Sequence, residues 1–307
     1  MRARRPAASG PAPTVLEQQL VNALSLGCVY ALFALGFTLI FGVLGVINLS
    51  HGAVFMVGAY AAEQAVVHFA APLWAALAFA FVFAGGLGLA IDWLVLRPLR
   101  ARGAPHLIPM IATIGVGIIL TNAVQGIFGA QNLRFPAGLV SERTLRIGGI
   151  DTTALGLGII ALSLALMAVL MLALRRTQLG RALRAIAESP RAAYLLGIDV
   201  EGLFRLTSFV AAGLGGLAGV LIGLYSNALF PLMGKSMLEK GIAVIILGGM
   251  GDMRGAMIGG LFLGLAEVLS VAYIGSSMRD AVAFGLLFLI LLLRPKGLFG
   301  TVFERKA

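Results

Sequence analysis

The sequence predicts an all-α, polytopic membrane protein, a helical bundle of about eight or nine spans. Of its 307 residues, 60% are hydrophobic and 12% are charged, whereas a soluble domain carries roughly 25% charged residues. Long apolar runs follow one another along the chain, and many approach the about 20 residues that a helix needs to cross a bilayer. The 41 glycines suit helices that pack closely in lipid through small residues. We therefore expect one transmembrane unit, surrounded by the lipid bilayer.

Composition and motifs exclude several classes of function. The net charge of +10 is not expected to serve nucleic acid, because most of the Arg and Lys residues flank apolar runs and orient them in the membrane. Cys28 is the one cysteine, so a disulfide or metal–thiolate site within one chain is excluded. The three histidines lack ligand spacing, and the sequence has no HExxH motif, rhomboid-type GxSG serine or P-loop. We expect no catalytic residues, metal or cofactor, and no ATP binding by a P-loop in this chain.

The chain divides into a tail, a transmembrane domain and a second short tail. Residues 1–15 are predicted to be disordered, 16–300 to form the transmembrane domain, and 301–307 to be a C-terminal tail. Residues 238–248 form an apolar run too short to cross alone at 1.5 Å per residue, so they must be extended, tilted or part of a broken helix. The predicted spans are 20–44, a second ending near 68, 72–96, 107–129, 154–174, 204–225, 238–248, 255–273 and 281–293.

Positive charge in the short loops predicts which ends of the spans face the cytoplasm. The loop cations fall in residues 97–106, in 175–205 and from 294 onward. Placing these segments in the cytoplasm leaves 130–153 as an extracytoplasmic loop, in which the weak alternation at 144–147 predicts a small hairpin. Three spans before residue 97 then put the N-terminus outside, although three arginines precede them. Either this short tail is translocated, or a broken helix near Asn48 alters the number of spans.

Two stretches of the sequence are similar to each other. Residues 50–63, SHGAVFMVGAYAAE, match residues 253–267, MRGAMIGGLFLGLAE, in order and in character. Each is followed one span later by Leu-Arg-Pro, at 96–98 and at 293–295. Matches in the same order predict a two-half pseudo-repeat without inversion, as in some transporters.

The longest charged, helix-forming stretch runs from Leu179 to Asp199, within residues 175–203, a predicted cytoplasmic loop. Arg184 and Glu188 are four residues apart and so fall on one helical face. Ser189 and Pro190 predict the N-cap and first position of a second helix, and Gly197 predicts a left-handed cap at its end. Two short helices joined by a corner suit a docking element, although an amphipathic connector at the membrane surface is also typical. Its modest apolar face would consist of Leu183, Ile186, Leu195 and Leu196.

Polar residues within apolar runs mark either a transport route or a membrane edge, because a central charge costs about 2.5–3.5 kcal/mol on insertion scales. Two glycine-rich breaks stand out, at 42–52 and at 248–255. Each predicts either an unwound segment whose backbone faces a solute route or a turn at the interface. The candidate pathway residues are Asn48, Ser50, His51, Gly52, Gly248 and Gly249.

Four other polar residues in the apolar runs are expected to help the helices pack rather than to contact solute. Glu63 and Glu267 lie deep enough in apolar runs to suggest a proton relay, but a glutamate that helps helices pack is the commoner case. Asn122 and Gln125 are expected to form hydrogen bonds between helices rather than to touch solute.

Four stretches resemble the LivH-type permease subunits of ABC importers for branched-chain amino acids. They are residues 22–52, which open the family's sequences, then 180–199, 247–260 and 294–300. The similarity extends over residues 20–300, whereas the arginine-rich N-terminal tail has no counterpart. It implies an importer permease fold in the bacterial inner membrane.

The resemblance also implies partners and a role for residues 175–203. The partners would be a LivM-like second permease subunit, two cytoplasmic ATP-binding subunits and an extracytoplasmic solute-binding protein. In that family this loop sits in a cleft of the ATP-binding subunit. The solute stays open, since related permeases serve branched-chain amino acids, urea, short amides and aromatic acids. The implied ATPase-coupling residues are Gly180, Arg181, Arg184, Glu188, Pro190 and Gly197.

Two other classes of function remain at this point. A secondary transporter or channel would move a small polar solute without ATP, and its uptake would survive loss of a neighbouring ATPase. A membrane scaffold would show no solute flux at all.

Overall fold

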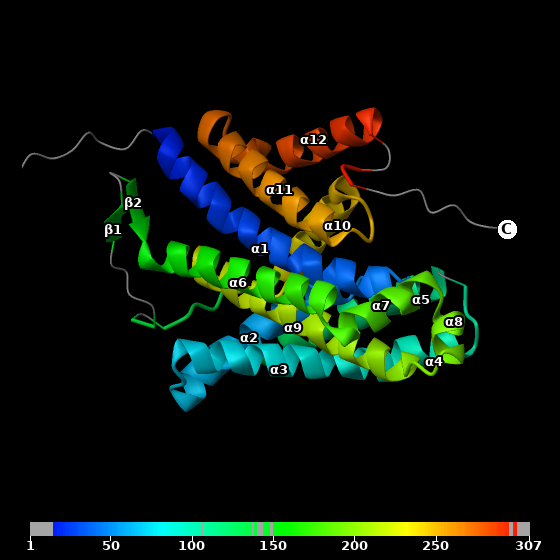
Figure 1. The fold of residues 1–307 in the computed structure, drawn as a ribbon. Coiled ribbons are helices and arrows are strands. Elements are labelled where there is room, and N and C mark those ends of the chain that lie inside the picture. Colours follow the sequence, from blue (N-terminus) through cyan, green and yellow to red (C-terminus); the bar gives the residue numbers. More distant parts are fainter. Residues whose placement is uncertain are drawn as a thin grey trace, which may run out of the picture.

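The computed structural model describes residues 15–105, 107–136, 138–139, 144–147, 150–294 and 297–299. The fold is a helical bundle with a small two-stranded hairpin at one end (Figure 1), which confirms the predicted all-α membrane class. The predicted tails, apart from Val15, lie outside the described residues. The helices are α1 (Val15–Leu44), α2 (His51–Phe69), α3 (Leu73–Ile91), the π-helix η1 (Asp92–Leu96), α4 (Arg97–Ala101), α5 (Leu107–Phe128), α6 (Ala154–Arg176), α7 (Gln178–Glu188), α8 (Pro190–Leu195), α9 (Val200–Ser226), α10 (Met233–Gly248), α11 (Met253–Tyr273), the 3-10 turn η2 (Ser276–Met278) and α12 (Arg279–Leu293).

The two ends of the bundle differ in character (Figure 1). The hairpin end carries β1 (Thr144–Ile147) and β2 (Ile150–Thr153), which pair in antiparallel fashion and confirm the predicted hairpin. The coupling end, at the right of Figure 1, carries α4, α7 and α8. Helix α1 begins at the hairpin end, opposite the arginine-rich segments at α4, α7 and α8. This agrees with the three crossings that the sequence predicts before residue 97.

Helix α1 is enclosed by other helices along most of its length. Its side chains from Cys28 to Phe37 are almost completely buried, and α11, α9, α6 and α10 pack around it. Glycines permit this approach: a Cβ on Gly260 of α11 would lie 2.4 Å from the backbone nitrogen of Ala31. Small residues at such crossings are how helices associate in lipid, where the hydrophobic effect between helices is lost.

Seven helices of the described chain are long and apolar enough to cross a bilayer. They include α3 through α4, which continue as one helix, and α5, α6, α9, α11, α12 and α1. Helices α2 and α10 are the shorter or more polar members of the bundle, and their N-termini meet inside it. There the backbones of Gly52 and Gly234 touch, because a Cβ on either would lie 2.3 Å from the carbonyl oxygen of the other. The short run at 238–248 is thus the C-terminal part of a helix that begins inside the bundle.

The predicted break at 42–52 takes the form of a turn that re-enters the bundle. Helix α1 ends at Leu44, and Gly45 follows with φ +67°, a conformation that glycine adopts without strain. The chain then returns inward, so that Ser50 lies against Gly117 near the middle of α5. The backbone N–H of Leu49 donates to the Thr113 hydroxyl of α5 over 3.1 Å. Helix α2 therefore starts in the interior and not at the bundle's end.

The arrangement of the helices agrees with the predicted pseudo-repeat. Helix α3 leads through η1 into the first Leu-Arg-Pro segment, and α12 ends at Leu293, where the second begins. Both helices run from the hairpin end to the coupling end in Figure 1. Because their directions agree, two halves related without inversion remain a sound prediction.

We expect Gly58→Ala to lower thermal stability. A Cβ there would lie 2.3 Å from the Cα of Gly216 in α9, and such overpacking costs about 1–3 kcal/mol. Thermal unfolding in detergent should show a midpoint about 5 °C lower. The matched control is Gly86→Ala in α3, where a Cβ meets nothing within 4 Å. This control should equal or exceed the parent, because Ala favours a helix interior over Gly. Equal losses in both variants would contradict the packing argument.

Candidate functional site

Helices α7 and α8 form the predicted pair of short helices, each with a capping side chain. Thr177 begins α7 and its hydroxyl accepts from the backbone N–H of Gly180 over 3.1 Å. Ser189 ends α7 and caps α8, accepting from the N–H of Ala192 over 3.2 Å, and Pro190 occupies the first position. Gly197 has φ +82°, the left-handed conformation predicted for it. The local structure of residues 175–203 is thus confirmed, whereas their coupling role stays a prediction.

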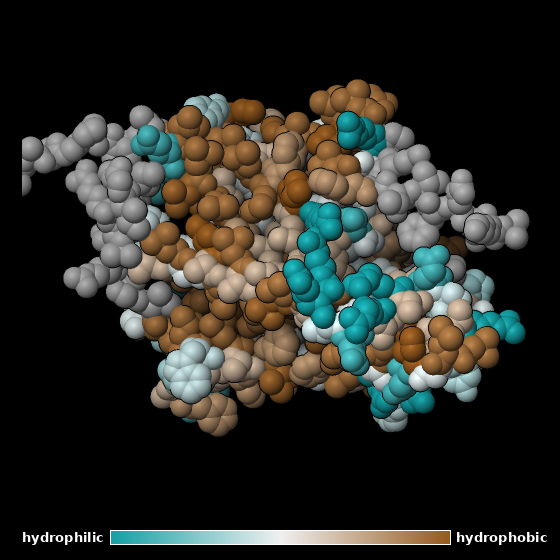
Figure 2. Space-filling model, viewed as in Figure 1, coloured by the Kyte–Doolittle hydropathy of each residue, from teal (hydrophilic) through white to brown (hydrophobic). Residues whose placement is uncertain are grey.

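The apolar residues of this loop divide between two surfaces. Leu183 and Ile186 are buried and fix α7 to the bundle. Leu195 and Leu196 are 77% and 80% exposed, so they form no common face with the first pair. In Figure 2, hydrophilic side chains gather at the coupling end near α7 and α8, beside the brown surface of the bundle. An exposed apolar tip rimmed by charge is typical of a protein-interaction site.

The arginine of α7 is held by the neighbouring helix. The Arg184 guanidinium donates to the carbonyl oxygen of Leu174 near the end of α6. Within the described residues no ion pair joins Arg184 to Glu188, although they lie one helical turn apart as predicted. Arg184 therefore fixes the angle between α6 and α7. Gly180 serves the same contact, since a Cβ there would lie 2.1 Å from the Leu174 carbonyl oxygen.

A charged network at the coupling end connects α4 with α9, the helix that directly follows residues 175–203. Asp92, fully buried in the π-helix, accepts from Arg100 of α4 over 2.8 Å. The Arg100 guanidinium also lies 4.6 Å from the centre of the Phe204 ring and 3.6 Å from Glu201 at the start of α9. Arg97 lies 3.5 Å from Glu201. Helix α9 directly follows the loop, so these contacts tie the loop's exit to α3 and α4.

The four predicted pathway residues near residue 50 build the re-entrant turn. The Asn48 side-chain oxygen accepts from the N–H and the hydroxyl of Ser50, over 3.1 and 2.6 Å. His51 is fully buried, stacks on Phe37 with ring centres 5.6 Å apart, and has no hydrogen-bond partner on either ring nitrogen within the described residues. Gly52 makes the close contact with α10. These side chains shape the turn and do not line the nearby pocket.

The pocket beside this turn, here called the central pocket, lies between α2, α5 and α10. Its volume is about 430 Å³. Leu49 and Ala53, the neighbours of the predicted residues, contribute to its wall. Asn122 lines it as well, and its side-chain amide donates to the carbonyl oxygen of Ile118 in its own helix over 2.8 Å, so the predicted bond between helices is wrong for Asn122. The other lining residues are Ile114, Gly117, Ile118, Thr121, Leu232, Gly234, Lys235 and Leu238.

Gly248 and Gly249 lie away from the central pocket. They end α10 at the coupling end, where a Cβ on Gly248 would lie 2.3 Å from the carbonyl carbon of Gly255 in α11. The backbone N–H of Phe299 donates to the Gly248 carbonyl over 3.0 Å. Gly52 meets the other end of α10 at Gly234, so Gly52 and Gly248 lie about 20 Å apart. The two predicted breaks nevertheless touch at their other ends, because a Cβ on Gly42 would lie 3.6 Å from the carbonyl oxygen of Gly251.

A buried ion cluster joins four helices. Glu267 of α11 is fully buried and accepts from the Tyr30 hydroxyl of α1 over 2.6 Å and from Lys240 of α10 over 2.5 Å. Arg279, at the start of α12, forms a further ion pair with it. This arrangement is the helix-packing role expected for Glu267, because each polar group finds a partner inside the bundle. Glu63 of α2 accepts instead from its neighbour Gln64 over 2.6 Å.

We expect Glu267→Gln to destabilise the protein by about 3 kcal/mol, because two cations would then share a site without its buried counter-charge. Chemical unfolding in detergent measures the loss. Asp280→Asn is the matched control: Asp280 lies 3.8 Å from Lys240, but its side chain is 67% exposed. An exposed pair contributes about 1 kcal/mol or less. If both variants lose the same stability, the cluster is not a structural junction.

Comparison with known proteins identifies the family. Residues 19–291 match the family described as "Branched-chain amino acid transport system / permease component". The permease protein BraD of a high-affinity branched-chain amino acid transport system in Pseudomonas aeruginosa is 37% identical, over 92% of this chain and 95% of the relative. The permease protein LivH of Escherichia coli is 36% identical with the same coverage.

A second Escherichia coli permease protein, LivM, is 27% identical over 93% of this chain and 71% of the relative. No solved structure matches the chain. The apolar helices and the family agree on a multi-pass membrane protein that acts in transport and is not itself an enzyme. The chain belongs to the family of permease components of branched-chain amino acid transport systems.

Proposed function

We propose that this chain is one of two permease subunits of an ATP-driven importer in the bacterial inner membrane, and that it carries branched-chain amino acids into the cytoplasm. The relatives are named for these solutes. The observation that carries the proposal is the central pocket at the meeting point of the α2 and α10 N-termini. A site inside the bundle, at two interrupted helices, is where transporters hold their substrates.

The lining of the central pocket suits an aliphatic amino acid. Lys235 and the N-terminal ends of α2 and α10 supply positive charge for a carboxylate, since a helix N-terminus carries about half an elementary charge. Thr121 and Asn122 offer oxygen acceptors for an ammonium group. Ile114, Ile118, Leu238 and Leu49 supply an apolar wall for a branched side chain.

A second permease subunit would complete this pocket. Helix α5 forms one wall and exposes large apolar side chains, among them Ile111 and Ile119. Lys235 and Asn122 line the central pocket and are both exposed, and a charged group facing lipid is costly. A protein partner would cover both the apolar face and the polar lining. A LivM-like chain suits this role, because the protein of that name is itself similar to this one.

Coupling to ATP would run through residues 175–203. The exposed tip at Leu195 and Leu196 would enter a cleft of a cytoplasmic ATP-binding subunit. Movement of this tip would reach α6 through Arg184 and α9 through the capping contact in which the Asp199 side chain accepts from Gly202 over 2.9 Å. We assign Gly180, Arg181, Arg184, Glu188, Pro190 and Gly197 to this element. An extracytoplasmic binding protein would deliver the solute at the hairpin end.

Reversing the charge at Arg184 together with Gly197→Val should uncouple ATP hydrolysis from uptake. The first change removes the hold on α6, and the second places a β-branched residue at positive φ, which costs about 1–2 kcal/mol. Reconstituted importer should hydrolyse ATP without taking up leucine, while the amount of protein in the membrane stays constant.

The matched control is Arg102→Glu with Gly103→Val in the α4–α5 loop. Gly103 also has positive φ, +63°, and a Cβ there meets nothing within 4 Å, as at Gly197. This control should retain coupled uptake. Normal uptake by the Arg184 and Gly197 variant would remove the docking assignment. Uptake that persists without any ATPase subunit would indicate a secondary transporter or channel instead.

Filling the central pocket should block transport without unfolding the bundle. A Cβ on Gly117 would lie 3.6 Å from the Cα of Ser50, so Gly117→Leu places its larger side chain beside the re-entrant turn. We expect leucine uptake by the reconstituted importer to fall about tenfold or more, equivalent to at least about 1.4 kcal/mol. Gly126→Leu on the same helix is the control, since Gly126 lies outside the pocket lining. Equal uptake in both variants would place the solute route elsewhere.

A further inference from the structure

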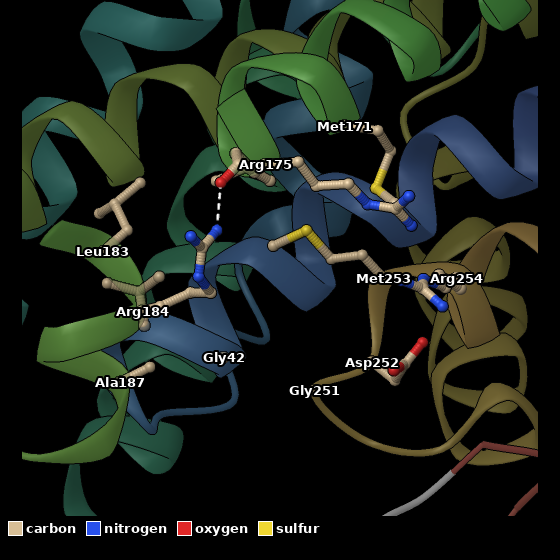
Figure 3. A pocket seen from close by; sticks show the side chains of 12 residues that line it. Gly42, Met171, Arg175, Leu183, Arg184, Ala187, Gly251, Asp252, Met253 and Arg254 are labelled. Atoms are coloured by element: carbon tan, nitrogen blue, oxygen red, sulfur yellow. Dashed lines mark hydrogen bonds between the residues drawn. The ribbon is translucent and has the colours of Figure 1, made fainter. Parts of the chain in front are cut away.

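A second pocket lies at the coupling end, between the end of α1, the end of α6, α7 and the α10–α11 turn (Figure 3). Its volume is about 240 Å³, and we call it the coupling-end pocket. The solute route proposed above does not use it. Neither does the exposed tip of the loop, because Leu195 and Leu196 are not among its lining residues.

Three arginines line this pocket against one carboxylate. Arg175, Arg184 and Arg254 reach it from α6, α7 and the start of α11 (Figure 3). The carboxylate of Asp252 caps α11, accepting from the backbone N–H of Gly255 over 2.7 Å. Within the described part of the chain, no ion pair neutralises any of the three arginines. The pocket therefore carries an excess of about two positive charges.

The lining of the pocket is partly apolar, and an exposed apolar face of α6 lies beside it. Met171, Met253 and Val43 line the pocket together with the charged groups. Leu172, which follows Met171 and lies about a quarter turn away around α6, is largely exposed, as expected of a helix face turned toward lipid. A ligand that satisfies both features has an anionic group and an attached hydrocarbon part.

We propose that the coupling-end pocket binds a phosphate group, and that an anionic phospholipid headgroup supplies it. Guanidinium groups bind phosphate through paired, charge-assisted hydrogen bonds. Basic pockets between membrane helices on the cytoplasmic side suit anionic headgroups. The bound phosphate would bridge α6, α7 and α11 and brace residues 175–203 against the bundle.

Native mass spectrometry of the full-length chain in a nonionic detergent tests the proposal. The probes are phosphatidylglycerol, which is anionic, and phosphatidylcholine, which has no net charge. The chain should retain one phosphatidylglycerol more tightly than the bulk of bound lipid. In the Arg175→Gln, Arg254→Gln double variant the affinity of this site should fall about tenfold or more, since each arginine contributes roughly 1 kcal/mol.

The control variant is Arg176→Gln, which removes the same charge next to Arg175 but outside the pocket lining. Its affinity should stay within about twofold of the parent chain, a difference below about 0.5 kcal/mol. Thermal unfolding without added lipid should give one midpoint for all three proteins, because the substituted arginines are exposed. If the thermal midpoint drops only in the double variant, lipid binding is compared in the single Arg175→Gln and Arg254→Gln variants instead. Each single variant should bind phosphatidylglycerol more weakly than the parent chain.

Inorganic phosphate distinguishes the two sources of the anion. The ligand is free phosphate if two results are obtained together. Inorganic phosphate protects the parent chain, but not the double variant, against thermal unfolding, and phosphatidylglycerol shows no specific site. Phosphatidylglycerol binding that phosphatidylcholine does not match assigns the lipid. The proposal is overturned if neither probe distinguishes the double variant from the parent. In that case, loss of ATPase-subunit binding by the double variant would assign the arginines to a partner's carboxylates.

Discussion

Close backbone contact around α1 is the condition on which the rest of this bundle depends. In lipid, helices gain little from burying apolar surface against one another, so tight packing and polar contacts must hold them together. Positions without a side chain provide that packing: a Cβ on Gly36 would lie 2.7 Å from the Ala211 carbonyl oxygen, and one on Gly264 would lie 2.4 Å from the Cα of Gly27. Each contact leaves no room for even one methyl group. The glycine content of the chain is thus a structural requirement of enclosing one helix on most of its sides.

Charge inside the bundle adds junctions that packing alone does not specify. Glu267 brings together α1, α10, α11 and α12, and Asp92 ties the π-helix to α4 and, through Arg100, to α9. Buried charges are expensive unless paired, so each of these carboxylates permits few arrangements of its helices. The Glu267 junction holds α10, which borders the central pocket. The Asp92 junction holds α9, which follows residues 175–203.

Local patterns in the sequence predicted most helices, and non-local contacts account for what it missed. The bounds of α5 and α6, the hairpin, and the Ser189–Pro190 corner all follow from apolar length, weak alternation or capping residues within a few positions. The central pocket does not, because Lys235, Gly117 and Leu49 are far apart in sequence and unremarkable singly. Asn48 and Ser50 drew attention as polar residues in an apolar run, yet their hydrogen bonds satisfy each other. The sequence indicated the place of the pocket, while its lining depended on packing.

Helix α1 also connects the two pockets. Gly42 and Val43 at its end line the coupling-end pocket. About one and a half to three turns earlier, Phe37 and Phe33 pack against His51, next to the turn that borders the central pocket. A close-packed interior transmits displacement, because its side chains have little free space in which to absorb it. We infer that a shift of α7 against the end of α1 must either move α1 along its glycine contacts or break them. Asn48, Ser50 and His51 are buried, and hydrogen bonds within the turn and from Leu49 to Thr113 hold it. The re-entrant turn would therefore move together with α1 and carry the displacement to the edge of the central pocket.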